Sequence, residues 1–218
     1  MSTAAAGLPQ DLDSARSGGT PIGAVLADLL PSPKLSASLE QGGAPARVRD
    51  AALVLGGAVL TGLAAQLSVP VPGSPVPVTG QTFAALLVGT ALGTRRGFLS
   101  LALYAVAGVV GVPWFAGGTS GSGAVSFGYI LGMLLASAAV GALARRGADR
   151  SPLRMAGTMI LGEAVIYAVG VPYLALAADM SASQAIANGL TPFLIGDALK
   201  AALAMGALPT AWKFVSKR

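Results

Sequence analysis

Six apolar segments separated by short loops decide what this chain can fold into. They are residues Ala51–Val69, Gln81–Gly93, Gly97–Val112, Val125–Ala144, Met155–Ala178 and Pro192–Lys213. The chain has 218 residues, of which 54% are hydrophobic and only 11% charged, whereas a soluble domain is typically about 25% charged. Long apolar runs of this kind are typical of transmembrane helices, so the sequence predicts an all-α integral membrane protein.

The second and third segments are short, because a helix needs roughly 17–25 residues to cross a bilayer. Arg95 and Arg96 lie between them. One long span through both segments would place two arginines near the centre of the bilayer, which is costly. We therefore predict a short helical hairpin with a tight turn at the two arginines.

Basic residues occur in every second loop. The basic positions beside the apolar segments are Arg47, Arg49, Arg95, Arg96, Arg145, Arg146, Arg150, Arg154, Lys213, Lys217 and Arg218. The loops Pro70–Gly80, Pro113–Gly123 and Asp179–Thr191 contain neither Lys nor Arg. Because short cytoplasmic loops are enriched in Lys and Arg, this alternation predicts six transmembrane helices, two cytoplasmic termini and three outward-facing loops.

The three outward loops are predicted to be structured. The first has four prolines between residues 70 and 77, which exclude a helix and stiffen the backbone into an extended lid. The third contains a capping-box pattern at Ser181–Gln184, which predicts a short helix that ends at Gly189. Thr191 and Pro192 then suit the start of the last segment. Structured loops above a helical bundle indicate a capped pocket that opens outward.

Residues 1–46 form a polar head rich in Gly, Pro and Ser. Within it, the run Ile22–Leu30 is too short to span a membrane. We predict a mostly disordered cytoplasmic head with at most one short interfacial helix, followed by a transmembrane domain over residues 47–218.

Lys200 is the one basic residue of the 14 that lies outside the loop pattern, and Asp197 precedes it by three residues. Residues at this spacing share a helix face. From a rise of 1.5 Å per residue, Lys200 and Glu163 differ in depth by roughly 6 Å in a bilayer core about 30 Å thick. Charged groups inside a membrane usually face a cavity, a partner or a substrate.

Two interpretations of these three charges remain open. Asp197, Lys200 and Glu163 could form a self-satisfied network that only fixes helix packing, or Asp197 and Lys200 could offer an acceptor and a donor to a ligand. Glu163 could pair with Lys200 or stay neutral in an apolar site.

Composition excludes several functions. The chain has no Cys and no His, so thiol chemistry is excluded and a transition-metal enzyme is disfavoured. The net charge of +5 comes from loops beside apolar spans, where basic residues orient the protein and meet anionic lipid rather than nucleic acid. The chain contains no P-loop, so ATP would have to be hydrolysed by another subunit. We predict no catalytic residues and no enzyme activity.

Aromatic residues flank the second outward loop. Trp114 and Phe115 precede its Gly-rich turn, and Tyr129 follows it. These three side chains can form a ligand wall, although each alone also suits the membrane interface or the core.

The order of several motifs resembles the BioY family. They are PVPVTGQT, LLVGTALGTRRGFLSLALYAVAGVVGVPWFAGG, GYILG, IYAVGVPYLALA and PFLIGDALKAALA, and they cover about residues 51–213. Members of this family are the substrate-capturing S components of energy-coupling-factor (ECF) transporters for biotin. The resemblance implies six transmembrane helices, loops that close over biotin, a membrane-buried coupling protein and two cytoplasmic ATPases as partners. It also implies transport by rotation of the whole S component in the membrane.

The resemblance implies site residues as well. Asp197 and Lys200 match the G-D-x-x-K motif that contributes to substrate binding, Tyr129 matches the G-Y-x-x-G motif, and Phe115, Gly117 and Gly118 match the F-A-G-G turn. Asp197 can accept a hydrogen bond from a ureido N–H of biotin, and Lys200 can donate to an oxygen.

We hypothesise that the ureido ring lies deep and the carboxylate lies near the N–H groups of Gly117 and Gly118. An S component for another small vitamin and an ion-coupled permease that uses Glu163, Asp197 and Lys200 are the alternatives. The absence of His and of a detectable internal repeat disfavours the permease.

Overall fold

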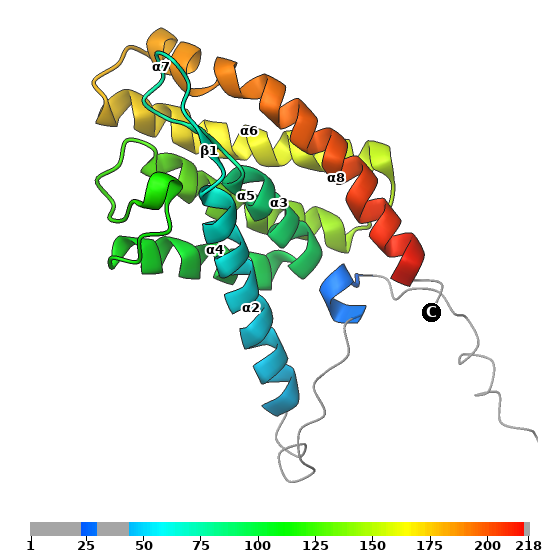
Figure 1. Ribbon diagram of the computed structural model, residues 1–218. Helices are drawn as coiled ribbons and strands as arrows, with labels where there is room; N and C mark the ends of the chain where they lie inside the picture. Colours follow the sequence, from blue (N-terminus) through cyan, green and yellow to red (C-terminus); the bar gives the residue numbers. More distant parts are fainter. Residues whose placement is uncertain (1–22, 30–43, 216–218) are drawn as a thin grey trace, which may run out of the picture.

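A computed structural model describes residues 23–29 and 44–215 (Figure 1). The described part is mostly helical. Its α-helices are α2 (Ala44–Ala65), α3 (Gln81–Leu92), α4 (Thr94–Val109), α5 (Phe127–Arg145), α6 (Pro152–Ala177), α7 (Ala182–Gly189) and α8 (Leu194–Val215). Three short 3₁₀ helices, η2 (Leu26–Leu29), η3 (Ala116–Gly118) and η4 (Thr191–Phe193), and a two-stranded antiparallel sheet of β1 (Ser68–Val69) and β2 (Val78–Thr79) complete it.

Each of the six predicted apolar segments contains a helix, although several boundaries differ. In the described residues, four helical stretches are long and apolar enough to cross a membrane, namely Ala46–Ala65, Phe127–Arg145, Pro152–Ala177 and Ala182–Phe214. Helix α3 is apolar but shorter. Helix α2 ends at Ala65 rather than at Val69, because Ser68 and Val69 pair with the other strand of the first outward loop.

The predicted hairpin of α3 and α4 is present, but its turn differs from the prediction. The chain reverses at Gly93, which has φ of 83°, a conformation that glycine adopts without a steric penalty. Arg95 and Arg96 then lie inside the first turn of α4 rather than in the turn itself. A single left-handed glycine is sufficient to end one helix and begin the next.

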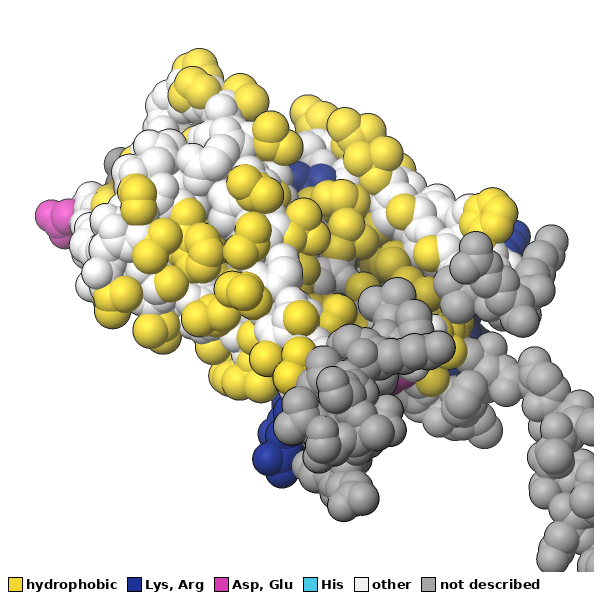
Figure 2. All heavy atoms as spheres, turned by 60° about the horizontal axis from the view of Figure 1, so that its bottom comes forward, with side chains coloured by type: hydrophobic (Ala, Val, Ile, Leu, Met, Phe, Trp, Pro, Cys, Tyr) yellow, Lys and Arg dark blue, Asp and Glu magenta, His cyan; other side chains and the backbone are white. Residues whose placement is uncertain are grey.

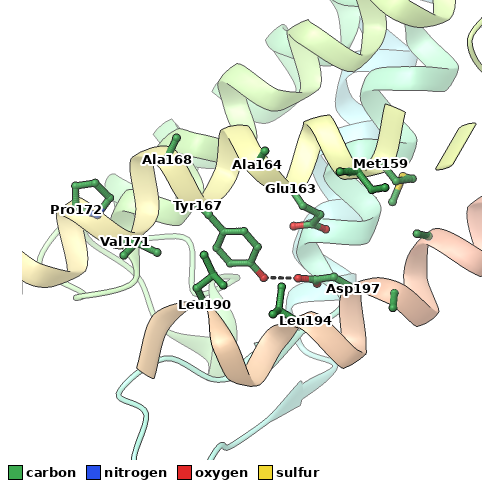
Figure 3. A pocket seen from close by; sticks show the side chains of 13 residues that line it. Met159, Glu163, Ala164, Tyr167, Ala168, Val171, Pro172, Leu190, Leu194 and Asp197 are labelled. Atoms are coloured by element: carbon green, nitrogen blue, oxygen red, sulfur yellow. Dashed lines mark hydrogen bonds between the residues drawn. The ribbon is translucent and has the colours of Figure 1, made fainter. Parts of the chain in front are cut away.

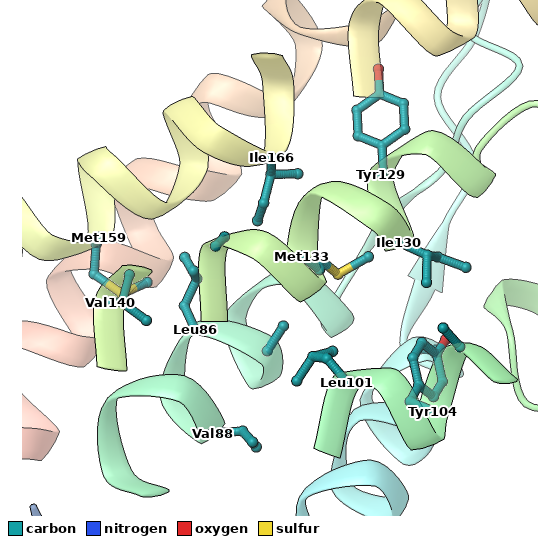
Figure 4. Packing of buried hydrophobic residues seen from close by; sticks show 14 of the residues in the cluster. Leu86, Val88, Leu101, Tyr104, Tyr129, Ile130, Met133, Val140, Met159 and Ile166 are labelled. Atoms are coloured by element: carbon teal, nitrogen blue, oxygen red, sulfur yellow. The ribbon is translucent and has the colours of Figure 1, made fainter. Parts of the chain in front are cut away.

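Helices α3, α4 and α5 contact one another through their backbones. A Cβ atom added at Gly97 would lie 2.7 Å from the Cα of Gly89, and one at Gly141 would lie 2.5 Å from the amide nitrogen of Thr94. Glycine permits this close approach. Around these contacts, Leu86, Leu101, Met133 and Ile166 are fully buried and join α3, α4, α5 and α6 into one core (Figure 4).

The outer surface of the bundle is apolar. Large hydrophobic side chains are more than half exposed at Leu63, Val106, Leu153, Ile160, Ile195 and Leu199. Figure 2 shows hydrophobic side chains spread over one face of the molecule, with few charged side chains among them. An apolar exterior of this extent suits contact with lipid, so the chain is a membrane protein.

The three loops that are predicted to face outward, called the outward loops, are structured, as predicted. The strands β1 and β2 form a short hairpin around the proline-rich tip, and Ser74 Oγ donates a hydrogen bond of 2.7 Å to the carbonyl of Asn188 at the end of α7. The capping box at Ser181 and Gln184 is confirmed, with both reciprocal hydrogen bonds present. The first and third loops are thus held together above the bundle.

Of the head, residues 44–46 already form the start of α2, and residues 23–29 also belong to the described part. They include η2, which lies near the ends of α2 and α8 that point away from the loops (Figure 1). The predictions of disorder for residues 1–22 and 30–43 fall outside the described residues.

Candidate substrate-binding site

A cavity lies under the first outward loop, between the loop-side ends of α3, α5, α6 and α8. Val76 and Pro77 of the loop and Phe193 of η4 supply apolar parts of its lining. The side chains with hydrogen-bonding groups in its lining include Gln81, Thr82, Tyr129, Tyr167, Asp197 and Lys200. The cavity therefore combines a small apolar cover with a cluster of donors and acceptors, which is the usual composition of a small-molecule site.

Lys200 and Asp197 form the centre of the polar cluster. Lys200 Nζ lies 3.1 Å from Asp197 Oδ1 and donates a second hydrogen bond of 2.8 Å to Thr82 Oγ1 of α3. Tyr167 of α6 donates to Asp197 Oδ2 (Figure 3). The spacing of three residues on α8 does place both charges on one face, as the sequence predicted.

This cluster is shielded from solvent. The side chains of Lys200 and Asp197 are 14% and 10% exposed, respectively. A buried pair of this kind is strongly coupled, since removing one partner leaves the other charge uncompensated. A ligand that enters the cavity can exchange hydrogen bonds with both residues while their ion pair keeps the local charge balanced.

Tyr129 connects the cavity to the third loop. Its hydroxyl donates a hydrogen bond of 2.7 Å to the carbonyl of Gly189 at the end of α7, and its ring packs edge-on against Tyr167, with 6.4 Å between ring centroids. The ring lines the cavity while the hydroxyl fixes the loop. Tyr129 thus links α5, α6 and the third loop at one point.

The cavity is too small for a typical ligand in the observed arrangement. Its volume is about 30 Å³, whereas small-molecule pockets usually measure roughly 300–1,000 Å³. Binding therefore requires the covering loops, including Val76 and Pro77, to move away from the helices.

Glu163 lies on the other side of Tyr167 and Asp197. These three residues line a groove of about 770 Å³ between α6 and α8 (Figure 3). Glu163 is 8% exposed, and within residues 23–29 and 44–215 neither of its carboxylate oxygens has a hydrogen-bond partner. Lys200 hydrogen-bonds to Asp197 and Thr82, so the described contacts include no Glu163–Lys200 pair.

The second outward loop contributes less to the cavity than expected. Trp114 Nε1 donates to the carbonyl of Tyr104 at 3.0 Å, and Phe115 is 3% exposed and packs edge-on against Tyr104. Among residues 114–118, Ala116 is the one in the cavity lining. In this arrangement Trp114 and Phe115 anchor the loop to α4.

Gly117 and Gly118 form the turn of that loop. Both have positive φ, of 70° and 71°, which explains why glycine is present at each position. The N–H of Gly118 donates to the carbonyl of Phe115 at 3.0 Å. Neither glycine is part of the cavity lining.

Sequence reasoning missed Tyr167, Thr82 and Gln81. The hydroxyl of Tyr104 donates to Gln81 Oε1 at 2.9 Å in the buried interior, and Thr82 accepts from Lys200. The sequence did contain a signal for Gln81 and Thr82, because they are polar residues at the start of an otherwise apolar segment. Polar residues in a membrane helix usually face the interior of the helical bundle.

In the described part of the chain, no group of three or more Asp and Glu side chains is placed to hold a metal.

Comparison with known proteins assigns the family. The sequence profile of the BioY family matches residues 35–217. The chain belongs to the BioY family. This membership agrees with the resemblance carried by the G-D-x-x-K and G-Y-x-x-G motifs, whose residues Asp197, Lys200 and Tyr129 meet in the cavity.

Two relatives match most of their own length. A protein of Pyrococcus horikoshii named a probable biotin transporter BioY is 33% identical over 162 residues, which cover 73% of this chain and 93% of that protein. The biotin transporter BioY2 of Lactococcus lactis subsp. cremoris is 34% identical over 154 residues, which cover 69% of this chain and 83% of that protein. The likeness therefore extends over the helical bundle and its loops.

A solved structure has the same fold. The crystal structure of the S-component for biotin from an ECF-type ABC transporter matches with a TM-score of 0.69 and 20% identity. The match covers 77% of this chain and 92% of the other. The two chains therefore share one arrangement of helices.

Proposed function

We propose that this protein takes up biotin as the S component of an ATP-driven ECF transporter. Membership of the BioY family and the names of its relatives support biotin as the substrate. The observation that carries the proposal is the buried Asp197–Lys200 pair in a cavity covered by two linked loops. In this role the site binds and releases its ligand, and the protein acts as a transporter rather than an enzyme.

The cluster suits the ureido ring of biotin, which has two N–H donors and one C=O acceptor. Asp197 accepts from a ureido N–H, and Lys200 or Thr82 donates to the ureido oxygen. The thioether ring lies against Tyr129 and Tyr167, whose rings line the cavity. Charged hydrogen bonds of this kind contribute about 1.5–3 kcal/mol each.

The carboxylate of biotin then points away from Asp197, toward the turn at Gly117 and Gly118. Since the N–H of Gly118 donates to Phe115 in the closed loop, this orientation requires the turn to rearrange as the loops admit the ligand. A biotin-bound structure with the carboxylate on Lys200 would overturn the orientation and leave the choice of substrate unaffected.

In the proposed topology the six helices α2, α3, α4, α5, α6 and α8 cross the cell membrane, although α3 and α4 are short, and both chain ends face the cytoplasm. Arg47 and Arg95 lie in the first turns of α2 and α4, and Arg145 and Lys213 lie in the last turns of α5 and α8. All four are therefore at the end of the bundle opposite the outward loops, as expected for cytoplasmic positions. A transmembrane coupling protein and cytoplasmic ATPase subunits supply the energy, and ATP is hydrolysed on those subunits.

Titration calorimetry of the detergent-purified protein with biotin tests the proposal, with Lys200→Ala measured in parallel. We expect tight binding by the native chain and a loss of at least about tenfold in the variant, because the ligand loses a charged donor. A folded native protein that does not bind biotin would refute the substrate and favour another small vitamin.

A further inference from the structure

Residues 23–29 of the head dock at the arginine-rich end of the bundle. Val25 is fully buried and Ala27 is 3% exposed. Both pack with Ala144 of α5, and Leu53 of α2 and Leu92 of α3 pack against them. A short segment that buries its apolar side chains among three helices is part of the folded core rather than a loose tail.

A network of charged hydrogen bonds fixes this segment. Asp28 Oδ1 accepts from Arg96 Nη1 of α4 at 2.6 Å, and Arg49 Nη2 of α2 lies 4.0 Å from the same oxygen. Asp28 Oδ2 accepts from the N–H of Val25 at 3.1 Å, which closes the segment into a turn. Burial alone would raise the pKa of the Asp28 carboxyl, but the hydrogen bonds and charges of its partners outweigh burial and lower this pKa.

Two further arginines hold the backbone of the segment. Arg145 Nη1 donates to the carbonyl of Gly23 at 3.2 Å, and Arg150 Nη2 to that of Ala24 at 3.5 Å. Arg150 also stacks over the ring of Trp212 in α8, with 4.6 Å to the ring centroid. The segment is therefore connected to α2, α4, α5 and, through Arg150, to α8.

The docked segment adjoins one end of an apolar groove. The groove has a volume of about 470 Å³ and runs between α2, α3 and α8. Small residues such as Gly56, Ala91 and Ala207 line it, and such surfaces let another helix approach closely. Leu53 and Leu92 belong both to the groove and to the contact with Val25 and Ala27.

We propose that residues Gly23–Leu29 are an intramolecular latch that covers the end of the groove at Leu53 and Leu92 and must leave that end before a partner helix can fill the whole groove between α2, α3 and α8. Undocking of the latch exposes Leu53 and Leu92 and frees Arg96 for an acidic group of the partner. The identity of that partner as the transmembrane coupling protein rests on the proposed function. The docking itself does not depend on it.

Cysteine labelling tests the docking directly, because the natural chain has no Cys. The variant Ala27→Cys is reacted with a charged, water-soluble maleimide, and Ser183→Cys, at an exposed position, serves as the reference. We expect the thiol introduced at position 27 to react far more slowly than the reference thiol. The additional change Asp28→Asn should speed the reaction about tenfold or more, because it removes the carboxylate that Arg96 and Arg49 hold.

Asp50→Asn is the matched control. Asp50 also pairs with Arg96, at 2.9 Å from its Nε, but lies outside the latch. This change should leave the thiol at position 27 protected. The latch proposal would be wrong if the thiol at position 27 reacted as fast as the reference thiol. It would also be wrong if Asp28→Asn and Asp50→Asn increased the labelling rate at position 27 equally.

Co-purification with the coupling protein tests the competition. The Asp28→Asn chain should retain several times more coupling protein than the native chain, with biotin affinity unchanged because the site lies at the other end of the bundle. Equal retention would overturn the competition. A native chain that fails to bind biotin would refute the proposed function. The labelling result does not depend on biotin and would still decide whether the segment docks.

Discussion

The cavity under the first loop and the groove between α6 and α8 share Tyr167 and Asp197 as a common wall, yet the first measures about 30 Å³ and the second about 770 Å³. Eight of the residues that line the smaller one have hydrogen-bonding side chains, namely Thr79, Gln81, Thr82, Ser126, Tyr129, Tyr167, Asp197 and Lys200. The larger one is lined mainly by alanine, valine, leucine and other apolar residues. Polar groups that converge on one point, rather than empty volume, identify the site at which a specific ligand binds.

The groove between α6 and α8 opens to the apolar outer surface of the bundle, which suits contact with lipid. Ala164, Ala168 and Ala198 line it and are exposed to the outside of the bundle, where lipid chains can fill the space between two helices. The covered cavity, in contrast, is closed by loops that are themselves hydrogen-bonded together. Four substitutions test this division between a binding cavity and a lipid-filled groove.

Asp197→Asn should have the largest effect. The change leaves Lys200 without its ion pair and alters the acceptor for Tyr167, so we expect biotin affinity to fall by about 100-fold or more. Calorimetry measures the loss. The control is Asp179→Asn, at an exposed position with φ of 52° that asparagine tolerates. Native affinity in Asp197→Asn would show that the shared wall does not touch the ligand.

Tyr167→Phe should have an intermediate effect. It removes the hydrogen bond to Asp197 and retains the ring, and a loss of about 1–1.5 kcal/mol corresponds to roughly tenfold weaker binding. Tyr173→Phe is the matched control, since its hydroxyl lies at an exposed site, 3.4 Å from the carbonyl of Ser122. If both variants bind alike, Tyr167 serves packing and not the ligand.

Ser74→Ala should mainly change the rate at which biotin dissociates. Loss of the hydrogen bond to Asn188 separates the first loop from the third, so the dissociation rate of biotin should rise about fivefold, for a bond worth roughly 1 kcal/mol. Stopped-flow displacement with labelled biotin measures this rate. Ser183→Ala on α7 serves as control, and an unaltered rate in Ser74→Ala would mean that the two loops move independently.

Ala164→Leu should have the smallest effect. The added side chain fills part of the groove between α6 and α8 without touching the covered cavity, so biotin affinity should stay within about twofold of the native value. The same calorimetric titration provides the test. A marked loss would show that the groove takes part in binding and that the two hollows act as one site.

Structure that depends on residues close together in the sequence was predicted correctly. The spacing of Asp197 and Lys200 placed them on one helix face, and the Ser181–Gln184 motif formed its capping box. Contacts between distant segments were not predictable in this way. The bond from Tyr167 to Asp197 depends on how α6 crosses α8, and the docking of Asp28 on Arg96 joins residues 68 positions apart. Trp114 was assigned to a ligand wall because sequence cannot tell an anchor from a lining residue.

The backbone contacts among α3, α4 and α5 also determine how unevenly this protein tolerates genetic change. Every single-base amino-acid replacement of a glycine codon introduces at least a Cβ atom, and at Gly97 and Gly141 that atom would meet backbone rather than a yielding side chain. At lipid-facing positions such as Ile195, exchange for another apolar residue leaves the packing unchanged. Harmful alleles should therefore cluster at a few glycine codons. On the outer faces of the same helices, exchanges among apolar residues should accumulate without harm.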